Sequence, residues 1–327
     1  MGTAVSSFHR GWPRYASEFH DGLVEISVSD GKYADKTGEL VLDPGLYRGW
    51  DFSEGLAVAM RKREELWGYI DTTGQFAISP RFETYPNGYV YPFSDGMAKI
   101  EAKGLFGFID HSGVFAIPPQ LLDAESFSDG MARVVVEGPC VYFPEGGCGG
   151  FNPVFPGVQN KKPLNKAYPS CKFTYINKSG KIITGQRFDG ARSFSEGLAP
   201  VRIGDLWGFI DRAGSIVIPP QFADAEPFSS GLSRILKDGK YGYIDKSGLI
   251  QISPQFAEAQ RFSDDLAVVG DKTGKSWYIN LRGERAFAGD FEEASPFFKG
   301  LANVRLPSTV RERFAYIDKT GRIVFRY

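Results

Sequence analysis

The stretch that decides the fold is residues 194–228, which read FSEGLAPVRIGDLWGFIDRAGSIVIPPQFADAEPF. The next stretch, residues 228–262, reads FSSGLSRILKDGKYGYIDKSGLIQISPQFAEAQRF and follows the same plan at an offset of 34 residues. In both, Phe-Ser-x-Gly-Leu leads to aromatic-Gly-aromatic-Ile-Asp, then to a glycine turn and to Ile-x-Pro-Gln-Phe. A fixed period of this length is typical of repeat proteins. The sequence therefore predicts a repeated supersecondary unit.

The unit recurs along nearly the whole chain of 327 residues. Its anchor is the glycine of Phe-x-x-Gly-Leu/Met, or the residue that replaces this glycine. The eight anchors, which number the modules from one to eight, are Gly22, Gly55, Gly96, Gly130, Gly197, Gly231, Asp265 and Gly300. We expect residues 1–327 to form a single repeat domain of about eight modules, each of about 34 residues.

Each module is predicted to form three antiparallel strands and a short return. In module five these are strand one (198–203), strand two (206–211), strand three (215–219) and the return (221–228). Gly214 supplies the positive φ of the turn between strands two and three. The Asp that ends strand two, such as Asp211, is expected to stabilise this turn.

Strand two carries large side chains on one face and small ones on the other. Trp207 and Phe209 point one way and Gly208 the other. Both faces are thus suited to burial, with the large face of one module against the small face of the next. We predict an all-β fold of small sheets in a propeller-like ring, and the alternative is an open β-solenoid or superhelix. Residues 13–19 resemble a return segment, and the last module lacks a full one. A ring closed by pairing the two chain ends would require this offset.

The modules differ mainly in the loop between strands one and two, which we call the loop edge. The largest insertion, residues 137–170, lies there in module four and is rich in Gly, Pro and aromatic residues. Binding surfaces of repeat proteins lie where insertions collect, and exposed aromatic side chains are the usual interface anchors. The predicted partner-binding residues are Tyr142, Phe143, Phe151 and Phe155 of the insertion, with Tyr85, Tyr89 and Tyr91 of a second irregular segment.

Three cysteines lie in or beside the insertion. Cys140 follows strand one and Cys171 precedes strand two, so a disulfide between them would close the neck of the loop. Such a bond needs an oxidising compartment, and Cys148 is then left over. A zinc site formed by all three is the alternative, but no Cys-x-x-Cys pair or neighbouring His supports it.

Composition and motifs exclude several classes of protein. The net charge of −1 lacks the positive excess of a nucleic-acid binder, and no apolar run is long enough for a membrane span. The sequence shows no phosphate-binding loop, dinucleotide fingerprint, nucleophile elbow or metal motif, so we expect no cofactor, no metal and no enzymatic activity. A pair of carboxylates hidden in the loops, as in a glycosidase, stays open as an alternative. No signal peptide is visible at the start, so the compartment stays open: the cytoplasm, or the periplasm or exterior if the start is trimmed.

The recurring Trp-Gly-Tyr/Phe-Ile-Asp, Ile-x-Pro and Phe-Ser-x-Gly-Leu-Ala elements resemble the WG-repeat (KWG) family of bacterial β-repeat proteins. The resemblance covers residues 52–120 and 173–318 well and residues 15–46 poorly. Departures are Ser276-Trp277 in module seven, Phe314-Ala315 in module eight and the insertion in module four. The resemblance implies binding or scaffolding, often in envelope or interaction proteins, without shared catalytic residues. The Trp and Gly of the motif are then structural.

The leading hypothesis is a non-catalytic interaction or scaffold module that binds a protein partner through its loop edge. The alternative is a lectin-like glycan binder, in which aromatic side chains stack on sugar rings at several equivalent weak sites. An enzyme with carboxylates in its loops is the third hypothesis, and it predicts loss of activity on substitution of a single Asp or Glu.

Overall fold

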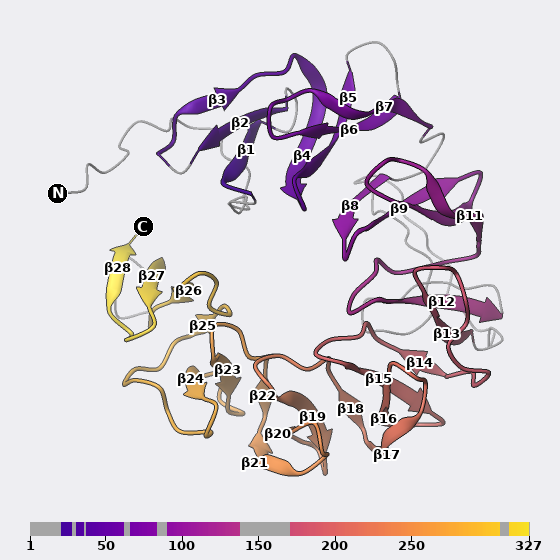
Figure 1. Ribbon diagram of the computed structural model, residues 1–327. Coiled ribbons are helices and arrows are strands. Elements are labelled where there is room, and N and C mark those ends of the chain that lie inside the picture. Colours follow the sequence, from indigo (N-terminus) through magenta and orange to yellow (C-terminus); the bar gives the residue numbers. More distant parts are fainter. Residues whose placement is uncertain are drawn as a thin grey trace, which may run out of the picture. The chain divides into compact units, whose positions relative to one another are not determined.

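The computed structural model contains only strands and their connections in the part that it describes (Figure 1), which comprises residues 21–27, 31–35, 37–61, 66–83, 90–137, 171–307 and 314–326. The strands of these residues form eight small antiparallel sheets with neighbours in chain order. The chain divides into two compact units: residues 1–136 with 175–182, and residues 137–174 with 183–327. Four-stranded antiparallel sheets of this kind are the blades of β-propellers, so the predicted all-β, propeller-like class is confirmed.

Unit one contains three complete sheets, formed by successive strands. They are β1 (Leu23–Ser27), β2 (Lys32–Asp35) and β3 (Leu40–Leu42); β4 (Leu46–Ser53), β5 (Leu56–Arg61), β6 (Leu66–Asp71) and β7 (Phe76–Glu83); and β8 (Val90–Ser94), β9 (Met97–Ala102), β10 (Leu105–Ile109) and β11 (Phe115–Leu121). A further sheet has two strands, β12 (Met131–Glu137) and β13 (Lys172–Asn177).

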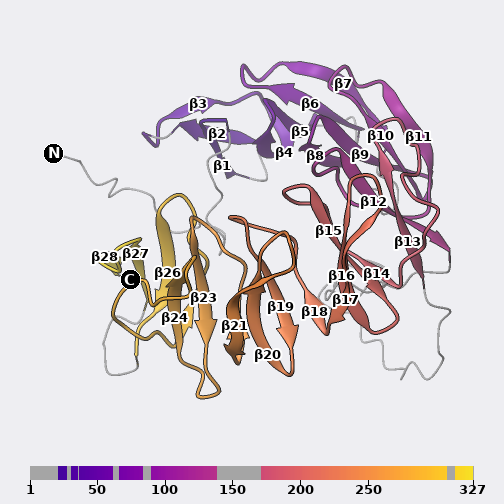
Figure 2. The same cartoon turned by 60° about the horizontal axis from the view of Figure 1, so that its bottom comes forward.

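Unit two contains four sheets, which Figure 2 shows side by side. They are β14 (Gly190–Ala191), β15 (Leu198–Ile203), β16 (Leu206–Asp211) and β17 (Ile216–Phe222); β18 (Asp224–Ala225), β19 (Ser233–Lys237), β20 (Lys240–Ile244) and β21 (Ile250–Phe256); β22 (Glu258–Ala259), β23 (Leu266–Gly270) and β24 (Ser276–Asn280); and β25 (Glu293–Ala294), β26 (Leu301–Arg305), β27 (Phe314–Asp318) and β28 (Ile323–Arg326).

The return segment forms a strand that the sequence did not predict. In module five, residues 224–225 leave the first sheet of unit two and pair with β19, so that Asp224 lies opposite Leu236 and Ala225 opposite Ile235. Each return thus begins the next sheet, which ties successive modules together by backbone hydrogen bonds. The pairing was missed because two residues are too few to show a strand pattern.

The glycine of the Trp-Gly motif is required by a close approach of strand three. A Cβ on Gly242 would lie 2.6 Å from the Ile252 carbonyl oxygen and 2.7 Å from the Pro254 nitrogen. Gly208 would collide in the same way with the Ile218 carbonyl oxygen. The strand-pair register shifts at these points, as expected of a β-bulge at the proline. The motif therefore couples Gly in strand two to Ile-x-Pro in strand three.

Two of the modules that lack this glycine also lack strand three in the described chain. Thr174 replaces it in module four and Trp277 in module seven. There, residues 178–188 and 281–291 contact strand two through isolated bridges, such as Ile176 with Ile182 and Ile279 with Arg285. In module eight, Ala315 replaces the glycine and no Ile-x-Pro follows, yet β28 still pairs with β27. The glycine is therefore required for the strand three that bulges at proline, not for every third strand.

Neighbouring sheets pack a large face against a small face, as the sequence predicted. In unit two, Trp207 and Phe209 of β16 join Ala225, Ile235 and Ile244 of the next sheet in one buried cluster. The aromatic ring in the middle of strand two also packs on the Phe that precedes the next anchor. The ring centroids lie 5.1 Å apart for Phe209 and Phe228, and 4.9 Å apart for Tyr243 and Phe262.

The Phe-Ser-x-Gly-Leu element connects each module to the next. The Ser229 hydroxyl donates to the Phe262 carbonyl oxygen at 2.6 Å, and the Ser195 hydroxyl donates to the Phe228 carbonyl oxygen at 2.7 Å. The Glu196 carboxylate accepts from the Gly231 N–H at 3.1 Å, and Lys246 pairs with the same carboxylate at 3.0 Å. The motif therefore encodes contacts between repeats.

Candidate partner-binding site

Two adjoining clefts lie along the seam between β18–β21 and β22–β24 in unit two. The first, cleft one, has a volume of about 210 Å³ and is lined by Arg234, Tyr241, Glu258, Ala259, Gln260, Val268, Val269, Gly270 and Ser276. Gly270 ends β23 and Ser276 begins β24, so this cleft reaches the foot of the module-seven loop between strands one and two. It therefore lies at the loop edge.

The second, cleft two, continues along the same seam. It has a volume of about 490 Å³ and is lined by Glu226, Ser229, Arg234, Gln260, Arg261, Phe262, Ser263 and Pro296. Arg234 and Gln260 line both clefts, so these two residues lie between them.

Arg234 is held between the two sheets by three kinds of contact. Its guanidinium lies 4.8 Å from the centroid of the Tyr241 ring, and it donates to the Ala259 carbonyl oxygen at 2.9 Å. It also contacts the carboxylates of Asp224 and Glu226 at 2.8 and 2.9 Å. Its Nε atom is buried without a hydrogen-bond partner.

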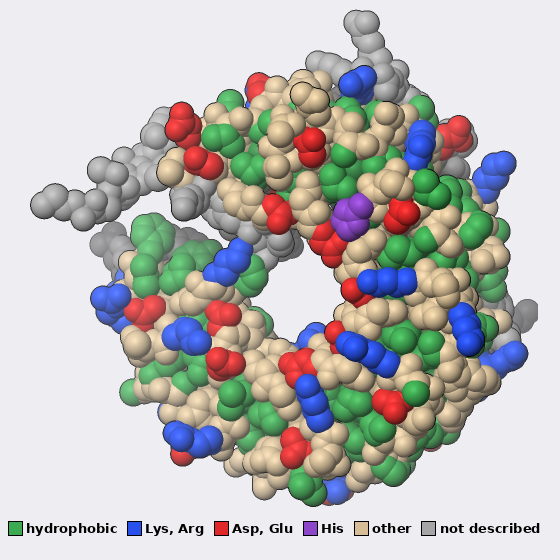
Figure 3. All heavy atoms as spheres, viewed as in Figure 1, with side chains coloured by type: hydrophobic (Ala, Val, Ile, Leu, Met, Phe, Trp, Pro, Cys, Tyr) green, Lys and Arg blue, Asp and Glu red, His purple; other side chains and the backbone are tan. Residues whose placement is uncertain are grey.

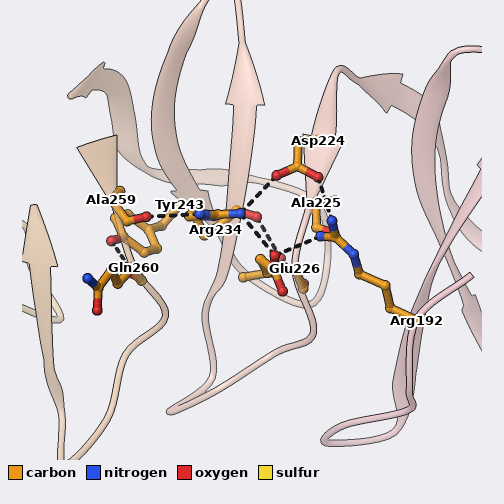
Figure 4. Close-up of polar contacts among 9 residues, drawn as sticks. Arg192, Asp224, Ala225, Glu226, Arg234, Tyr243, Ala259 and Gln260 are labelled. Carbon is orange, nitrogen blue, oxygen red and sulfur yellow. Dashed lines mark hydrogen bonds and ion pairs between the residues drawn. The ribbon is translucent and has the colours of Figure 1, made fainter. Parts of the chain in front are cut away.

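Arg192 binds the same two carboxylates from the preceding sheet (Figure 4), at 3.0 Å from Asp224 and 2.9 Å from Glu226. Its guanidinium lies 4.6 Å from the centroid of the Trp207 ring. The four charged side chains are between 15% and 23% exposed, so water screens them less than it screens surface pairs. Two cations and two anions thus form a balanced network across two seams.

The backbone around Arg261 is fixed by Tyr243 of β20. The Tyr243 hydroxyl donates to the Gln260 carbonyl oxygen at 2.7 Å, and the Tyr243 ring packs on Phe262. Burial raises the pKa of Tyr243 well above its usual value, so this hydroxyl remains a donor at physiological pH. The segment 260–262 is therefore anchored on both sides of Arg261.

Most of the predicted partner-binding aromatics lie outside the described residues: Tyr85, Tyr89, Tyr142, Phe143, Phe151 and Phe155. Their role remains a prediction. Tyr91 lies in β8 of unit one and is partly buried. The Lys99 ammonium is 3.9 Å from the Tyr91 ring centroid, and the Tyr91 carbonyl oxygen accepts a 2.8 Å hydrogen bond from Tyr69. Tyr91 is thus part of a seam in unit one.

Cys171 is disulfide-bonded and only 3% exposed. Cys140 and Cys148 lie outside the described residues, so the pairing of Cys140 with Cys171 stays a prediction.

The aspartates that end strand two stabilise turns. Asp245 accepts hydrogen bonds from the N–H groups of Ser247 and Leu249 at 2.9 and 3.1 Å. The pKa of Asp245 lies below its usual value, mainly because the Ser247 hydroxyl donates a hydrogen bond to the carboxylate. The two backbone N–H groups lower it further. The same geometry occurs at Asp71, Asp110 and Asp271. Within the described residues, no group of three or more His, Cys, Asp or Glu side chains is arranged to hold a metal ion.

One carboxyl group of unit one has a raised pKa, as the carboxyl groups of catalytic acids often do. Glu25 of β1 is 8% exposed, and burial, with the nearby Asp51 charge, raises its pKa to about 8. Burial also raises the pKa of Tyr33, and the charges of Glu25 and Asp51 raise it further. Glu25 occupies the strand-one position that Lys99, Arg133 and Arg234 hold in other modules. This is a position in a seam between sheets, where burial explains the shift.

On the face drawn in Figure 3, Lys and Arg side chains are interspersed with Asp and Glu. No helix among the described residues is long and apolar enough to cross a membrane.

Sequence reasoning missed Arg234 and Arg261 as site residues. A weak signal for Arg261 was present: the residue before the anchoring Phe is elsewhere Pro, Ser, Asp or Glu, as at Pro227, Ser193 and Asp51, and never another cation. Nothing in the sequence showed that Arg234 and Gln260 lie between two clefts, because this depends on the pairing of modules six and seven.

Comparisons with known proteins agree with the repeat pattern. The family model described as WG containing repeat matches residues 33–62, 67–105, 106–138, 173–207, 207–241 and 241–275. The comparison with curated proteins gave no match.

Solved structures that the comparison matched include the computationally designed Ika8 protein, with 13% identity, a TM-score of 0.45, and coverage of 84% of this chain and 85% of that chain. BamB from Moraxella catarrhalis has 9% identity, a TM-score of 0.43, and coverage of 89% and 92%. The C-terminal WD40 domain of Sif2 has 10% identity, a TM-score of 0.39, and coverage of 90% and 79%. These similarities are too low to inform function. The matches of the repeat model cover more than half of the sequence, and the chain belongs to the family of WG-containing repeats.

Proposed function

We propose that this protein is a non-catalytic interaction or scaffold module that binds a protein partner through its loop edge. The observation that carries the proposal is cleft one, which reaches this edge at Gly270 and Ser276. Its lining combines an aromatic ring, apolar side chains and charged groups, as the centre of a protein interface does. The 137–170 insertion belongs to the same type of loop in module four.

The chemistry of the described residues also supports binding rather than catalysis. The seam carboxylates Asp224 and Glu226 are each held by two arginines, and the turn aspartates bond their own backbone. A general acid or base must reach a substrate proton. Glu25, whose pKa is raised, is buried between sheets of unit one.

The glycan alternative is less well supported. It needs several equivalent aromatic platforms, one for each repeat. However, Trp67 and Trp207, which begin the motif in modules two and five, are only 8% and 6% exposed. Tyr241 at the same position is covered on one face by Arg234.

The test is a capture experiment with three forms of the chain. The first is intact, the second has residues 138–170 replaced by a short Gly-Ser loop, and the third carries Ser276→Trp at the mouth of cleft one. Captured proteins are identified by mass spectrometry, and circular dichroism confirms that each form folds. We expect the intact chain to capture a protein that at least one altered form loses. If the intact chain binds glycans on an array but captures no protein, or if all three forms capture the same proteins equally, the proposal is wrong.

A further inference from the structure

We propose that cleft two binds a carboxylate group of the partner, with Arg261 as its main contact. The inference rests on the proposed function and names the chemistry of one part of the partner. It follows from the charges, the repeat position and the anchoring of the residues that line the cleft.

One cation of cleft two, Arg261, is not neutralised by a neighbouring carboxylate in the described part of the chain. Arg234 and Arg192 are matched by Asp224 and Glu226. Arg261 has no acidic partner among the described residues, and its one hydrogen bond is a long contact of 3.4 Å with the Phe228 carbonyl oxygen. An arginine fork with free N–H donors favours a carboxylate, which it can bind through two parallel hydrogen bonds.

The position of Arg261 is unusual within the repeat. The neighbouring modules have Pro227 and Pro296 at this point, and Pro296 forms a wall of the same cleft. Proline at this position offers neither a charge nor an N–H donor. Because the repeat itself does not require an arginine here, folding alone does not explain it.

The structure holds the backbone that carries the donors of cleft two in place before any ligand binds. Tyr243 bonds the Gln260 carbonyl oxygen and packs on Phe262, while the Ser229 hydroxyl donates to the Phe262 carbonyl oxygen. Arg261 lies between these anchored residues, and the exposed amide of Gln260 is beside it. An anchored backbone reduces the entropy that the segment loses on binding.

The single excess charge fits a carboxylate better than a doubly charged phosphate. A protein supplies carboxylates from two sources, the C-terminus of its chain and the side chains of Asp and Glu. Both are tested with short probes: acetyl-Gly-Gly-Phe with a free C-terminus, the same peptide amidated, and acetyl-Gly-Asp-Phe amide.

The experiment measures binding of these three peptides to the full chain by amide and arginine side-chain NMR shifts. We expect at least one carboxylate peptide to shift the signals of Gln260, Arg261 and Ser263, and the amidated Gly-Gly-Phe peptide to leave them in place. Arg261→Gln should weaken this binding about tenfold or more, the loss of one charged hydrogen-bond pair. Arg282→Gln is the matched control, because Arg282 is exposed in a turn where it pairs with Glu284, and it should leave the affinity unchanged.

Three results would overturn the proposal: no shift with either carboxylate peptide, equal binding of the amidated Gly-Gly-Phe peptide, or unchanged affinity in Arg261→Gln. Shifts with the free C-terminus alone identify a terminal carboxylate, and shifts with the Asp peptide alone identify an acidic side chain. If Arg261→Gln still captures the protein partner while carboxylate peptides do not bind, the carboxylate inference fails and the proposed function stands.

Discussion

Glycine in strand two is the residue on which the repeat depends most directly. At Gly208 the backbone of Ile218 and Pro220 occupies the space that a side chain would need. Tryptophan beside it is the more conspicuous half of the motif, but its ring packs like other aromatic side chains, and Tyr241 takes its place in module six. The glycine instead makes room for a third strand that bulges at proline, whereas Ala315 of module eight pairs with a third strand that has no proline.

Gly208→Ala should therefore lower the free energy of unfolding of unit two by about 2 kcal/mol, the usual cost of overpacking. Gly185→Ala is the control, because a Cβ there meets no atom within 4 Å. Urea denaturation of both variants measures the difference. Equal stabilities would show that strand three can move away without cost.

The buried Glu25 predicts how the folding stability of the chain depends on pH. Its pKa is about 8 in the folded chain, against an ordinary value of 4.5, so the folded state keeps a proton that the unfolded state has lost. The stability contributed by this group is then complete below pH 4.5 and decreases as the pH rises toward 8.

Glu25→Gln should remove this decrease and stabilise the chain at pH 9 relative to wild type, by on the order of 3 kcal/mol. Glu39→Gln, at an exposed residue of the same unit, should leave the pH profile of the wild type intact. Unfolding midpoints measured between pH 5 and 9 make the comparison. A wild-type profile retained in Glu25→Gln would assign the pH dependence to other groups.

At the scale of elements, the seam between sheets carries most of the specific contacts. Tyr243 and Tyr278 occupy the same position in consecutive sheets, and each donates its hydroxyl to a carbonyl oxygen of the next return, that of Gln260 at 2.7 Å and that of Ser295 at 2.8 Å. The first bond anchors Gln260, next to Arg261, and the second anchors Ser295, next to the Pro296 wall of cleft two. The pair therefore separates the anchoring of Arg261 from that of an apolar wall.

Tyr243→Phe and Tyr278→Phe should each destabilise unit two by about 1 kcal/mol, the net value of a buried hydrogen bond. Tyr243→Phe alone should weaken binding of the carboxylate peptides, because Arg261 loses the anchor of its neighbour. Thermal unfolding and peptide titration measure the two effects. Equal loss of peptide binding in both variants would mean that the effect follows general stability.

The charged network of Figure 4 should contribute more to the free energy of unfolding than exposed ion pairs do. Arg192→Met leaves Asp224 and Glu226 with one arginine in place of two, which should cost about 2 kcal/mol at a partly buried site. Arg282→Met, which removes an exposed pair with Glu284, should change stability by less than about 0.5 kcal/mol. Denaturation at low and high salt checks both values, and similar costs for the two variants would contradict the role of the network.

Much of the sheet structure could be predicted from sequence, because strands one to three carry regular apolar patterns and turns marked by glycine. The return strand, such as residues 224–225, could not, since its two residues pair only through the next module. The missing third strand of module seven could have been inferred from Trp277, had the close contact of the motif glycine been known. Within the clefts, Tyr241 belongs to the motif, while Arg234 and Arg261 look like ordinary surface cations until the seam brings them together.

For the whole molecule, repetition explains stability and departures from repetition suggest function. Modules five and six keep the full motif and form complete four-stranded sheets. Module seven departs from it at Trp277, the return that leads into its sheet carries Arg261, and this sheet forms one wall of both clefts. The insertion of module four is the other large departure, and its predicted aromatic contacts remain to be tested.

The most direct test of partner binding at the loop edge is hydrogen exchange of the intact chain with and without its captured partner. We predict slower exchange at residues 237–241 and 270–276, which belong to the strand one–two loops of modules six and seven. Protection confined to the opposite turns, residues 211–215 and 245–249, would contradict binding at the loop edge.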